Sequence, residues 1–152
     1  MKKIIVVVAD TVTGANGITV VQPLGRRVAQ VAHVVSKVRV AMFIAGLWRV
    51  VGRPSNIVGD RLSLVARIKK IIEHLALPFE PFTTIVLSCR DSKELLHVQG
   101  LMNGTLPYEV FEDYDQPDYG DVNLKVTTAI ATWPVESDKI EGITDYLPLL
   151  YK

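Results

Sequence analysis

The order of its predicted elements makes this chain of 152 residues an α/β protein with three layers, in which helices cover both faces of a four-stranded mixed sheet. Two observations predict this fold. Short apolar runs of strand length alternate with longer segments of helical periodicity. The last two strands are separated by a polar segment alone, which favours an antiparallel pair within the sheet. The length suits one hydrophobic core, and we expect a single domain over residues 1–152.

The N-terminal elements are a strand, a loop and a long helix. The strand is KIIVVVAD, residues 3–10, whose continuous β-branched run is typical of a strand buried on both faces. Residues 11–25 carry three glycines and no charge, which predicts a loop with a short extended piece at ITVV. The helix begins at about Leu24 and runs into the forties, where Gly46 and the GRPSN stretch mark its end. Apolar residues nearly all round the helix predict that it is largely buried.

The middle of the chain contains a second helix, a second strand and a third helix. Residues 61–75, RLSLVARIKKIIEHL, keep the apolar spacing of a helix, and residues 83–89, TTIVLSC, form the second strand. DSKELLHVQGLMNG predicts a helix with Asp91 or Ser92 as its N-cap and Gly104 just past its end.

The last three elements are two strands and a helix. YEVFED, residues 108–113, and KVTTAIATW, residues 125–133, are the third and fourth strands. Residues 137–150, SDKIEGITDYLPLL, predict a helix with Ser137 as its N-cap. The complete order is strand, helix, helix, strand, helix, strand, strand, helix, which places helices on two sides of the sheet.

The charges divide the chain into a basic and an acidic part. Ten basic residues and one acid lie between Arg26 and Lys70, whereas five basic residues and fourteen acids follow from Ile71 onwards. Such a separation favours a polyanion-binding surface on the basic part. The alternative is that these charges lie on solvated helix faces and meet the acidic part across the fold.

Cysteine content and apolar segments indicate a soluble, cytoplasmic protein. The single cysteine, Cys89, excludes an internal disulfide, and its apolar surroundings predict a buried, inert thiol. No signal peptide is visible, and the nine residues of VAMFIAGLW, 40–48, are too few to cross a bilayer. We therefore expect no membrane association. The apolar side chains of residues 40–48 predict instead a homodimer through this segment.

Arg26, Gln30 and His33 recur at steps of four and three in GRRVAQVAHVVSKV, so they share one face of the long helix. This pattern resembles the first-helix signature of the type II peptidyl-tRNA hydrolases, the archaeal and eukaryotic kind, which carry Gly-Lys, then Ala-Gln, then His at this spacing. The resemblance covers most of the chain, with residues 11–24 and 39–60 longer than expected. The matching residues are Asp10, Gly25, Arg26, Ala29, Gln30, His33, Asp113, Thr128 and Pro134.

The resemblance implies the fold of that family and a cofactor-free esterase that releases peptides stranded on tRNA. This reaction needs a cation near the tRNA end, polar groups that orient water, and donors for the developing oxyanion. The implied catalytic residues are Asp113, Thr128, Arg26 and His33. The expected substrate-binding residues are Gly25, Arg26, Arg27, Gln30 and, from the basic part of the chain, Lys69 and Lys70. We expect tRNA as the partner and neither a metal nor a cofactor.

Two departures from the family pattern keep a second function open. The family follows its aspartate with Ala-Gly-x-Thr, whereas Asp113 is followed by Tyr-Asp-Gln-Pro-Asp. The family also carries an arginine two positions before the aspartate of its first strand, where this chain has Val8. The DQPD stretch is similar to the divergent peptidyl-tRNA-hydrolase-domain-containing branch, which carries Glu-Gln-Pro-Glu there. The alternative function is a non-catalytic module that binds RNA or protein on the same fold.

The acidic segment of residues 109–121 raises the question of a metal site. It carries six carboxylates, but Pro117 falls where an EF-hand calcium loop needs an oxygen ligand, and no acid closes the loop. The sequence therefore favours a solvated turn. It also contains no Walker-type loop, no GxGxxG after a strand, no zinc-ligand spacing and no GxSxG elbow, which leaves nucleotide binding and serine-esterase chemistry unsupported.

Overall fold

The structure, a computed structural model, describes residues 2–14, 17–51, 69, 72–73, 82–113 and 125–150. The chain divides into two compact units. The first, called the sheet unit below, contains Met1–Val38 and Phe82–Lys152, and the second contains Arg39–Pro81. All described strands belong to the sheet unit. The expectation of a single domain over the whole chain stays a prediction.

The sheet is mixed, with β1 at its centre. β3 runs parallel to β1 along one edge, β5 runs antiparallel to β1 along the other edge, and β4 pairs antiparallel with β5. The short β2 pairs with the last residues of β1, so the described sheet has five strands and the expected number of four is wrong. The α/β class and the antiparallel β4–β5 pair are confirmed. The elements are β1 Lys3–Thr13, β2 Thr19–Val21, α1 Leu24–Val51, β3 Thr83–Asp91, α3 Ser92–Met102, β4 Tyr108–Asp113 and β5 Val126–Thr132.

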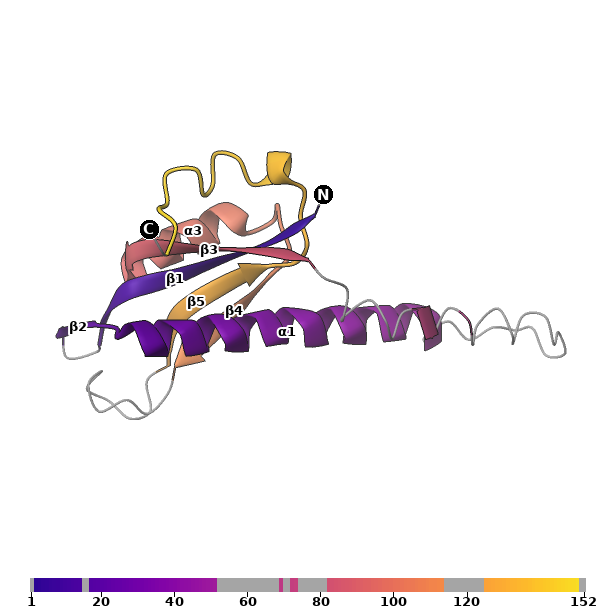
Figure 1. The fold of residues 1–152 in the computed structure, drawn as a ribbon, viewed down its shortest axis with the longest axis horizontal. Coiled ribbons are helices and arrows are strands. Elements are labelled where there is room, and N and C mark those ends of the chain that lie inside the picture. Colours follow the sequence, from indigo (N-terminus) through magenta and orange to yellow (C-terminus); the bar gives the residue numbers. More distant parts are fainter. Residues whose placement is uncertain are drawn as a thin grey trace, which may run out of the picture. The chain divides into compact units, whose positions relative to one another are not determined.

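The two faces of β1 are both buried, as its continuous apolar sequence predicts. The odd-numbered side chains from Ile5 to Ala9 join one hydrophobic core with residues of β3, β5 and α3. The even-numbered side chains from Ile4 to Val8 are fully buried as well. Figure 1 shows α3 on one side of the sheet and the first part of α1 on the other. Within the sheet unit, each face of the sheet is therefore covered by one described α-helix. The sequence predicts four helices along the whole chain.

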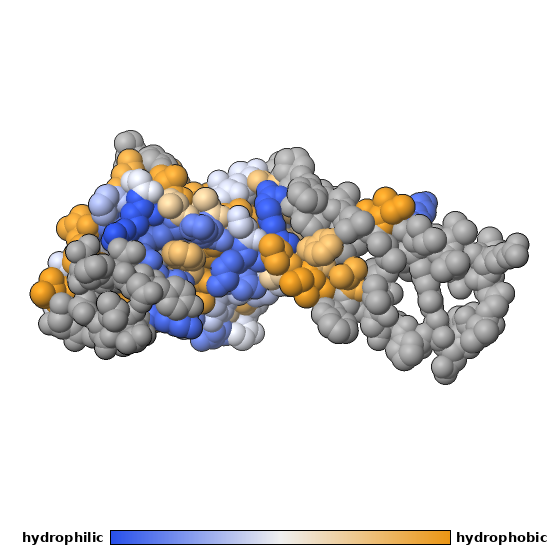
Figure 2. Space-filling model, turned by 90° about the horizontal axis from the view of Figure 1, so that it is seen from below, coloured by the Kyte–Doolittle hydropathy of each residue, from blue (hydrophilic) through white to orange (hydrophobic). Residues whose placement is uncertain are grey.

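Helix α1 is long, but its burial differs from the prediction. Among its described side chains, only Gln30, Val34 and Val38 are buried, and they follow each other at intervals of four. Val28 is 44% exposed and Val40 is 57% exposed, so the expectation of a largely buried helix is wrong. One stripe of a helix is enough to contact a flat sheet, and the remaining apolar residues face away from it. Seen from below the view of Figure 1, hydrophobic residues lie exposed beside hydrophilic ones on this side of the molecule (Figure 2).

By length and composition alone, Leu24–Leu47 would also qualify as a membrane-spanning helix. The core helix of a soluble protein and a signal sequence meet the same criterion, so this is weak evidence for a membrane. The cytoplasmic location stays a prediction, and so does the homodimer through residues 40–48.

Helix α3 begins and ends as its capping residues predict. The Asp91 Oδ1 atom accepts hydrogen bonds from the backbone N–H groups of Lys93, at 3.0 Å, and Glu94, at 2.9 Å. These bonds satisfy two donors that the first turn of a helix leaves without partners. Asn103 is the C-cap, and Gly104 follows with a φ of +76°, a conformation that glycine adopts without strain.

The C-terminal segment corrects one prediction. Residues 137–150 do not form the expected α-helix: they contain only a 3₁₀ turn, Ser137–Lys139, whose N-cap is Glu136 rather than Ser137. Gly142 has a φ of +80°, and its N–H donates to the Asp145 carboxylate at 2.8 Å, a local bond that replaces helical ones. The segment then continues along β3.

Backbone hydrogen bonds hold this C-terminal segment against the edge of β3. The Ser88 N–H donates to the Pro148 carbonyl at 2.9 Å, and the Leu150 N–H donates to the Val86 carbonyl at 3.0 Å. Covering an otherwise open strand edge in this way protects it from pairing with other chains. These long-range bonds outweigh the helical spacing of the segment.

The predicted helix of residues 61–75 lies mostly outside the described residues. Its described residues, 69, 72 and 73, are helical, and the Lys69 ammonium lies 4.0 Å from the Glu73 carboxylate. The polar connection of residues 114–124 is also outside the described part of the chain, together with Asp115, Pro117, Asp118 and Asp121 of the acidic segment.

Candidate functional site

The candidate site lies where β1, α1 and β4 bring polar side chains together. Asp10 follows the buried apolar run of β1, Gln22 precedes α1, and Asp113 is the last residue of β4. The Gln22 N–H donates to the Asp10 carbonyl at 2.8 Å, which fixes the entrance of α1 beside this part of β1. The fold therefore places the polar residues of α1 next to the carboxylates of two strands.

Asp10 forms an ion pair with α1. Its Oδ1 atom accepts from Arg27 Nη1 at 2.5 Å, and its Oδ2 atom lies 3.4 Å from the Ser88 hydroxyl of β3. The Arg27 side chain is 20% exposed and that of Asp10 is 39% exposed, so the pair is partly shielded from water. Arg27, which the sequence predicts as a substrate-binding residue, uses its guanidinium to join α1 to β1.

A chain of amides joins this region to Asp113. Gln22 Nε2 donates to the Ala9 carbonyl at 2.7 Å, and Gln22 Oε1 accepts from Gln30 Nε2 at 2.6 Å. Gln30 Nε2 also donates to Asp113 Oδ2 at 3.3 Å. Both glutamines are buried, with exposed fractions of 1% and 2%. Gln30 thereby joins helix α1 to strand β4.

Thr128 lies at an irregularity of the sheet next to Asp113. Phe111 pairs with Ala129 and Glu112 pairs with Thr127, so Thr128 has no partner opposite it on β4. This is a β-bulge, a device that redirects side chains and is frequent beside functional sites. Thr128 is 0% exposed.

Three buried polar atoms have no hydrogen-bond partner among the described residues: Thr128 Oγ1, Gln30 Oε1 and Arg27 Nε. Leaving a buried donor or acceptor unpaired costs about 1–3 kcal/mol, which makes such atoms rare in stable folds. All three belong to residues that the sequence predicts for the site. They are the atoms of this region with unused hydrogen-bonding capacity.

The other predicted site residues lie at different places on α1 or beyond it. Arg26 is partly buried, and Gly25, next to it, is exposed and has open space around its Cα. His33 is exposed, and its ring stacks on that of Phe111 in β4. Lys69 belongs to the second unit, where its side chain is 77% exposed, and Lys70 lies outside the described residues.

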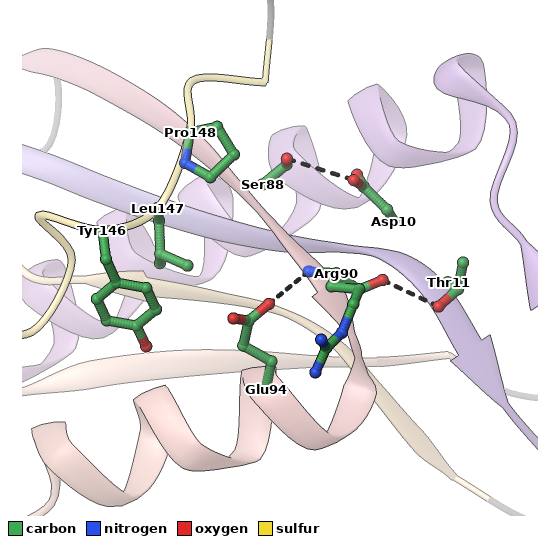
Figure 3. Close-up of a pocket in the computed structure, with 8 residues that line it drawn as sticks. All are labelled: Asp10, Thr11, Ser88, Arg90, Glu94, Tyr146, Leu147 and Pro148. Atoms are coloured by element: carbon green, nitrogen blue, oxygen red, sulfur yellow. Dashed lines mark hydrogen bonds between the residues drawn. The ribbon is translucent and has the colours of Figure 1, made fainter.

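A cavity of about 440 Å³ opens beside Asp10, at the end of β3. Figure 3 shows Glu94 and Tyr146 pointing into the same space from α3 and from the C-terminal segment. The Glu94 carboxylate accepts from the Arg90 N–H at 2.6 Å. Burial, followed by the charge of Glu94, raises the pKa of Tyr146, so this phenol stays protonated at neutral pH. The remaining lining residues are Thr11, Ser88, Leu147 and Pro148.

Cys89 lies near this cavity and is chemically inert. Its side chain is 1% exposed, and burial, together with the charges of Glu94 and Asp10, raises the pKa of the thiol to about 12. The nucleophilic thiolate is therefore almost absent at neutral pH. The prediction of a buried, unreactive thiol is confirmed.

No group of three histidine, cysteine or carboxylate side chains that could hold a metal ion occurs among the described residues. In that part of the acidic segment, the carboxylates have other partners: Glu112 lies 3.8 Å from the Lys125 ammonium, and Glu109 accepts from Trp133 Nε1 at 3.4 Å.

Two residues of this region, Gln22 and Phe111, were not predicted from the sequence; Asp10 and Arg27 were named, but not the ion pair between them. Gln22 had one local signal, since it is the only polar side chain between Ile18 and Gly25 apart from Thr19. Phe111 had none, because an aromatic residue in a strand is most often part of a core. Neither a comparison with protein-family models nor a search of curated proteins finds a match for this chain.

Proposed function

We propose that this protein is a cofactor-free esterase that acts on peptidyl-tRNA, with a fold of the type II peptidyl-tRNA hydrolase kind. The observation that carries the proposal is the Gln22–Gln30–Asp113 chain of hydrogen bonds, because Gln30 and Asp113 are two of the residues that the sequence resemblance assigns to the site. They lie 83 positions apart in the chain, yet their side chains meet.

The strand arrangement supports the fold part of this proposal. A parallel β1–β3 pair, an antiparallel β5 and an outer β4, with α1 and α3 on opposite sides, agree with the element order on which the resemblance rests. Arg26 lies in the first turn of α1, where the backbone N–H groups of the helix also favour anions. Its guanidinium suits a phosphate or a developing oxyanion, because it binds oxygen atoms through a planar fork and keeps its charge.

The proposed reaction needs no atom beyond the substrate and water. Asp113 orients a water molecule, whose oxygen attacks the carbonyl carbon of the ester between peptide and ribose. The water proton passes to the Asp113 carboxylate, the bond between the acyl carbon and the ribose oxygen breaks, and the proton then passes to that ribose oxygen. Gln30 holds the carboxylate in place, and the Arg26 guanidinium stabilises the negative charge on the carbonyl oxygen, whereas the Thr128 hydroxyl, which is fully buried, does not contact the substrate.

Turnover of a peptidyl-tRNA by the purified protein tests this proposal. Asp113→Asn should reduce kcat/KM by about 10² to 10⁴-fold, as loss of an acid–base group does. Arg26→Ala should cost about 10² to 10³-fold, because it removes the charged donor to the carbonyl oxygen. Asp138→Asn is the matched control, because Asp138 is an exposed carboxylate in the turn of residues 137–139.

Absence of turnover by the wild type, or turnover by Asp113→Asn and Arg26→Ala that equals that of the wild type, would rule out the enzymatic proposal. The second candidate is a non-catalytic module that binds RNA or protein on the same fold. It is favoured by Val8, which is 0% exposed and apolar where the family has an arginine, and by the missing threonine after Asp113. Specific binding of tRNA without ester cleavage would establish this second function.

A further inference from the structure

His33 and Phe111 form an aromatic pair beside the candidate site. Their ring centroids are 5.2 Å apart and their planes differ by 6°, which is the offset-stacked arrangement that aromatic rings favour. The His33 ring belongs to α1 and the Phe111 ring belongs to β4. His33 is exposed, and no hydrogen bond ties its ring to another described residue. One side of the stack therefore remains accessible to a third flat ring.

Cations on α1 accompany this pair. Within the sheet unit, the helix carries three basic residues, Arg26, Arg27 and Lys37, and no acidic residue. Lys37 lies one turn after His33, and its ammonium donates to the Val110 carbonyl of β4 at 2.6 Å, next to Phe111. Arg26 lies two turns before His33, on the same face. A flat aromatic surface between cations is the arrangement that binds single-stranded nucleic acid, because bases stack and phosphates contact the charges.

The carboxylates on neighbouring positions of β4 already have hydrogen-bond or ion-pair partners. Asp113 accepts from Gln30, Glu109 accepts from Trp133, and Glu112 lies close to Lys125. Their partners reduce the repulsion that these groups would exert on a phosphate chain. The cations of α1 thus face no unpaired carboxylate of β4.

We propose that the His33–Phe111 pair is a stacking platform for the terminal, unpaired base of a tRNA acceptor end. The identity of this base rests on the proposed function, because the ester joins the peptide to the ribose of the terminal nucleotide. Phe111 and Asp113 are two positions apart on one strand, so they lie on the same face, about 7 Å from each other along the chain. In a terminal nucleotide, a single ribose likewise separates the base from the ester. The platform would therefore hold the base while Asp113 faces the ester.

Fluorescence of a terminal 2-aminopurine tests this inference on the intact protein. The probe is a short single-stranded RNA with the sequence of a tRNA acceptor end and 2-aminopurine in place of its last base. Stacking on the platform quenches the fluorescence of 2-aminopurine. The wild type should quench it, whereas His33→Ala and Phe111→Leu should lose the quenching and bind about 5- to 150-fold more weakly. His33→Tyr keeps a flat ring at this position, so it should quench the fluorescence and bind the RNA about as well as the wild type does.

His97→Ala is the matched control, because His97 is an exposed histidine of α3, on the opposite side of the sheet. It should change neither quenching nor affinity. An RNA that lacks its terminal base should bind the wild type and His33→Ala equally, since the ring then has nothing to stack on. Circular dichroism of each variant checks that the fold is retained.

The outcomes separate this inference from the proposed function. If peptidyl-tRNA is hydrolysed, His33→Ala should raise KM far more than it lowers kcat, which distinguishes a binding surface from a catalytic base. Turnover together with unchanged quenching and affinity in His33→Ala would overturn the platform and leave the esterase standing. Absence of turnover with quenching that depends on His33 would overturn the esterase and leave the platform as part of an RNA-binding module.

Discussion

On the face of the sheet covered by α3, the strands meet leucine, valine and methionine, whereas on the face along which α1 runs they meet glutamine and arginine in addition to valine. Leu95, Val98 and Met102 of α3 are each 0% exposed and pack into one continuous core. The face toward α1 instead contains the Asp10–Arg27 pair and the amide chain to Asp113. The same strands therefore supply most of their apolar burial on one face and their polar chemistry on the other.

Comparison of the two faces shows how a small domain accommodates a site whose buried polar groups lower its stability. Buried amides and unpaired polar atoms reduce stability, and the core beneath α3 offsets that cost through apolar burial. Variants of the α3 face should therefore change the free energy of unfolding strongly, whereas variants of the α1 face should change binding or turnover more than stability.

The largest expected effect on stability comes from truncating the core. Leu95→Ala should lower the free energy of unfolding by about 2–5 kcal/mol, because it removes a fully buried side chain and leaves a cavity. Urea unfolding followed by circular dichroism measures this. Leu96→Ala is the matched control on the same helix: its side chain is 56% exposed, so the change should stay within about 0.5 kcal/mol. Similar losses in both variants would contradict the contrast between the faces.

A smaller effect is expected from the ion pair on the α1 face. Arg27→Met should destabilise the protein by about 1–2 kcal/mol, between the values typical of exposed and of buried pairs. A double-mutant cycle with Asp10→Asn measures the coupling of the two side chains. Arg90→Met is the comparison, because the Arg90–Asp91 pair includes a side chain that is 81% exposed and should contribute less than about 1 kcal/mol. Equal coupling in the two pairs would show that burial does not distinguish them.

The smallest effect concerns the N-cap of α3 and its dependence on pH. Asp91→Ala should cost about 1 kcal/mol at neutral pH through the loss of two hydrogen bonds to backbone N–H groups. These bonds, and the neighbouring Arg90, lower the pKa of Asp91 below its ordinary value of 3.8. The resulting stabilisation is fully present above about pH 4 and is lost as the pH falls through the lowered pKa.

Asp91→Asn isolates this titration, because asparagine keeps an oxygen that accepts the cap hydrogen bonds but carries no charge. The difference in stability between the wild type and Asp91→Asn should therefore shrink as the pH is lowered from 6 to 3. Thermal unfolding at several pH values measures it. A difference that stays constant, or grows toward low pH, would contradict the lowered pKa.

Elements with strong local signals could be predicted from the sequence. The apolar run of β1, the cap at Asp91 and the glycine after α3 are each found where local patterns predict them. The C-terminal segment was mispredicted because its helical spacing competes with hydrogen bonds to β3, more than 50 positions earlier in the chain. The burial of α1 was also mispredicted, since an apolar composition does not tell which side chains a sheet will cover.

Hydrophobic periodicity and capping act over a few neighbouring residues. Such local patterns were therefore enough to predict the α/β class, the positions of most strands and the polar stripe of Arg26, Gln30 and His33. The contacts that this stripe makes with other side chains depend on the tertiary structure. Gln30 contacts Asp113 and His33 stacks on Phe111 through strand pairings between distant parts of the chain. The bulge that leaves Thr128 without a partner likewise arises from the register of two strands, which local sequence does not encode.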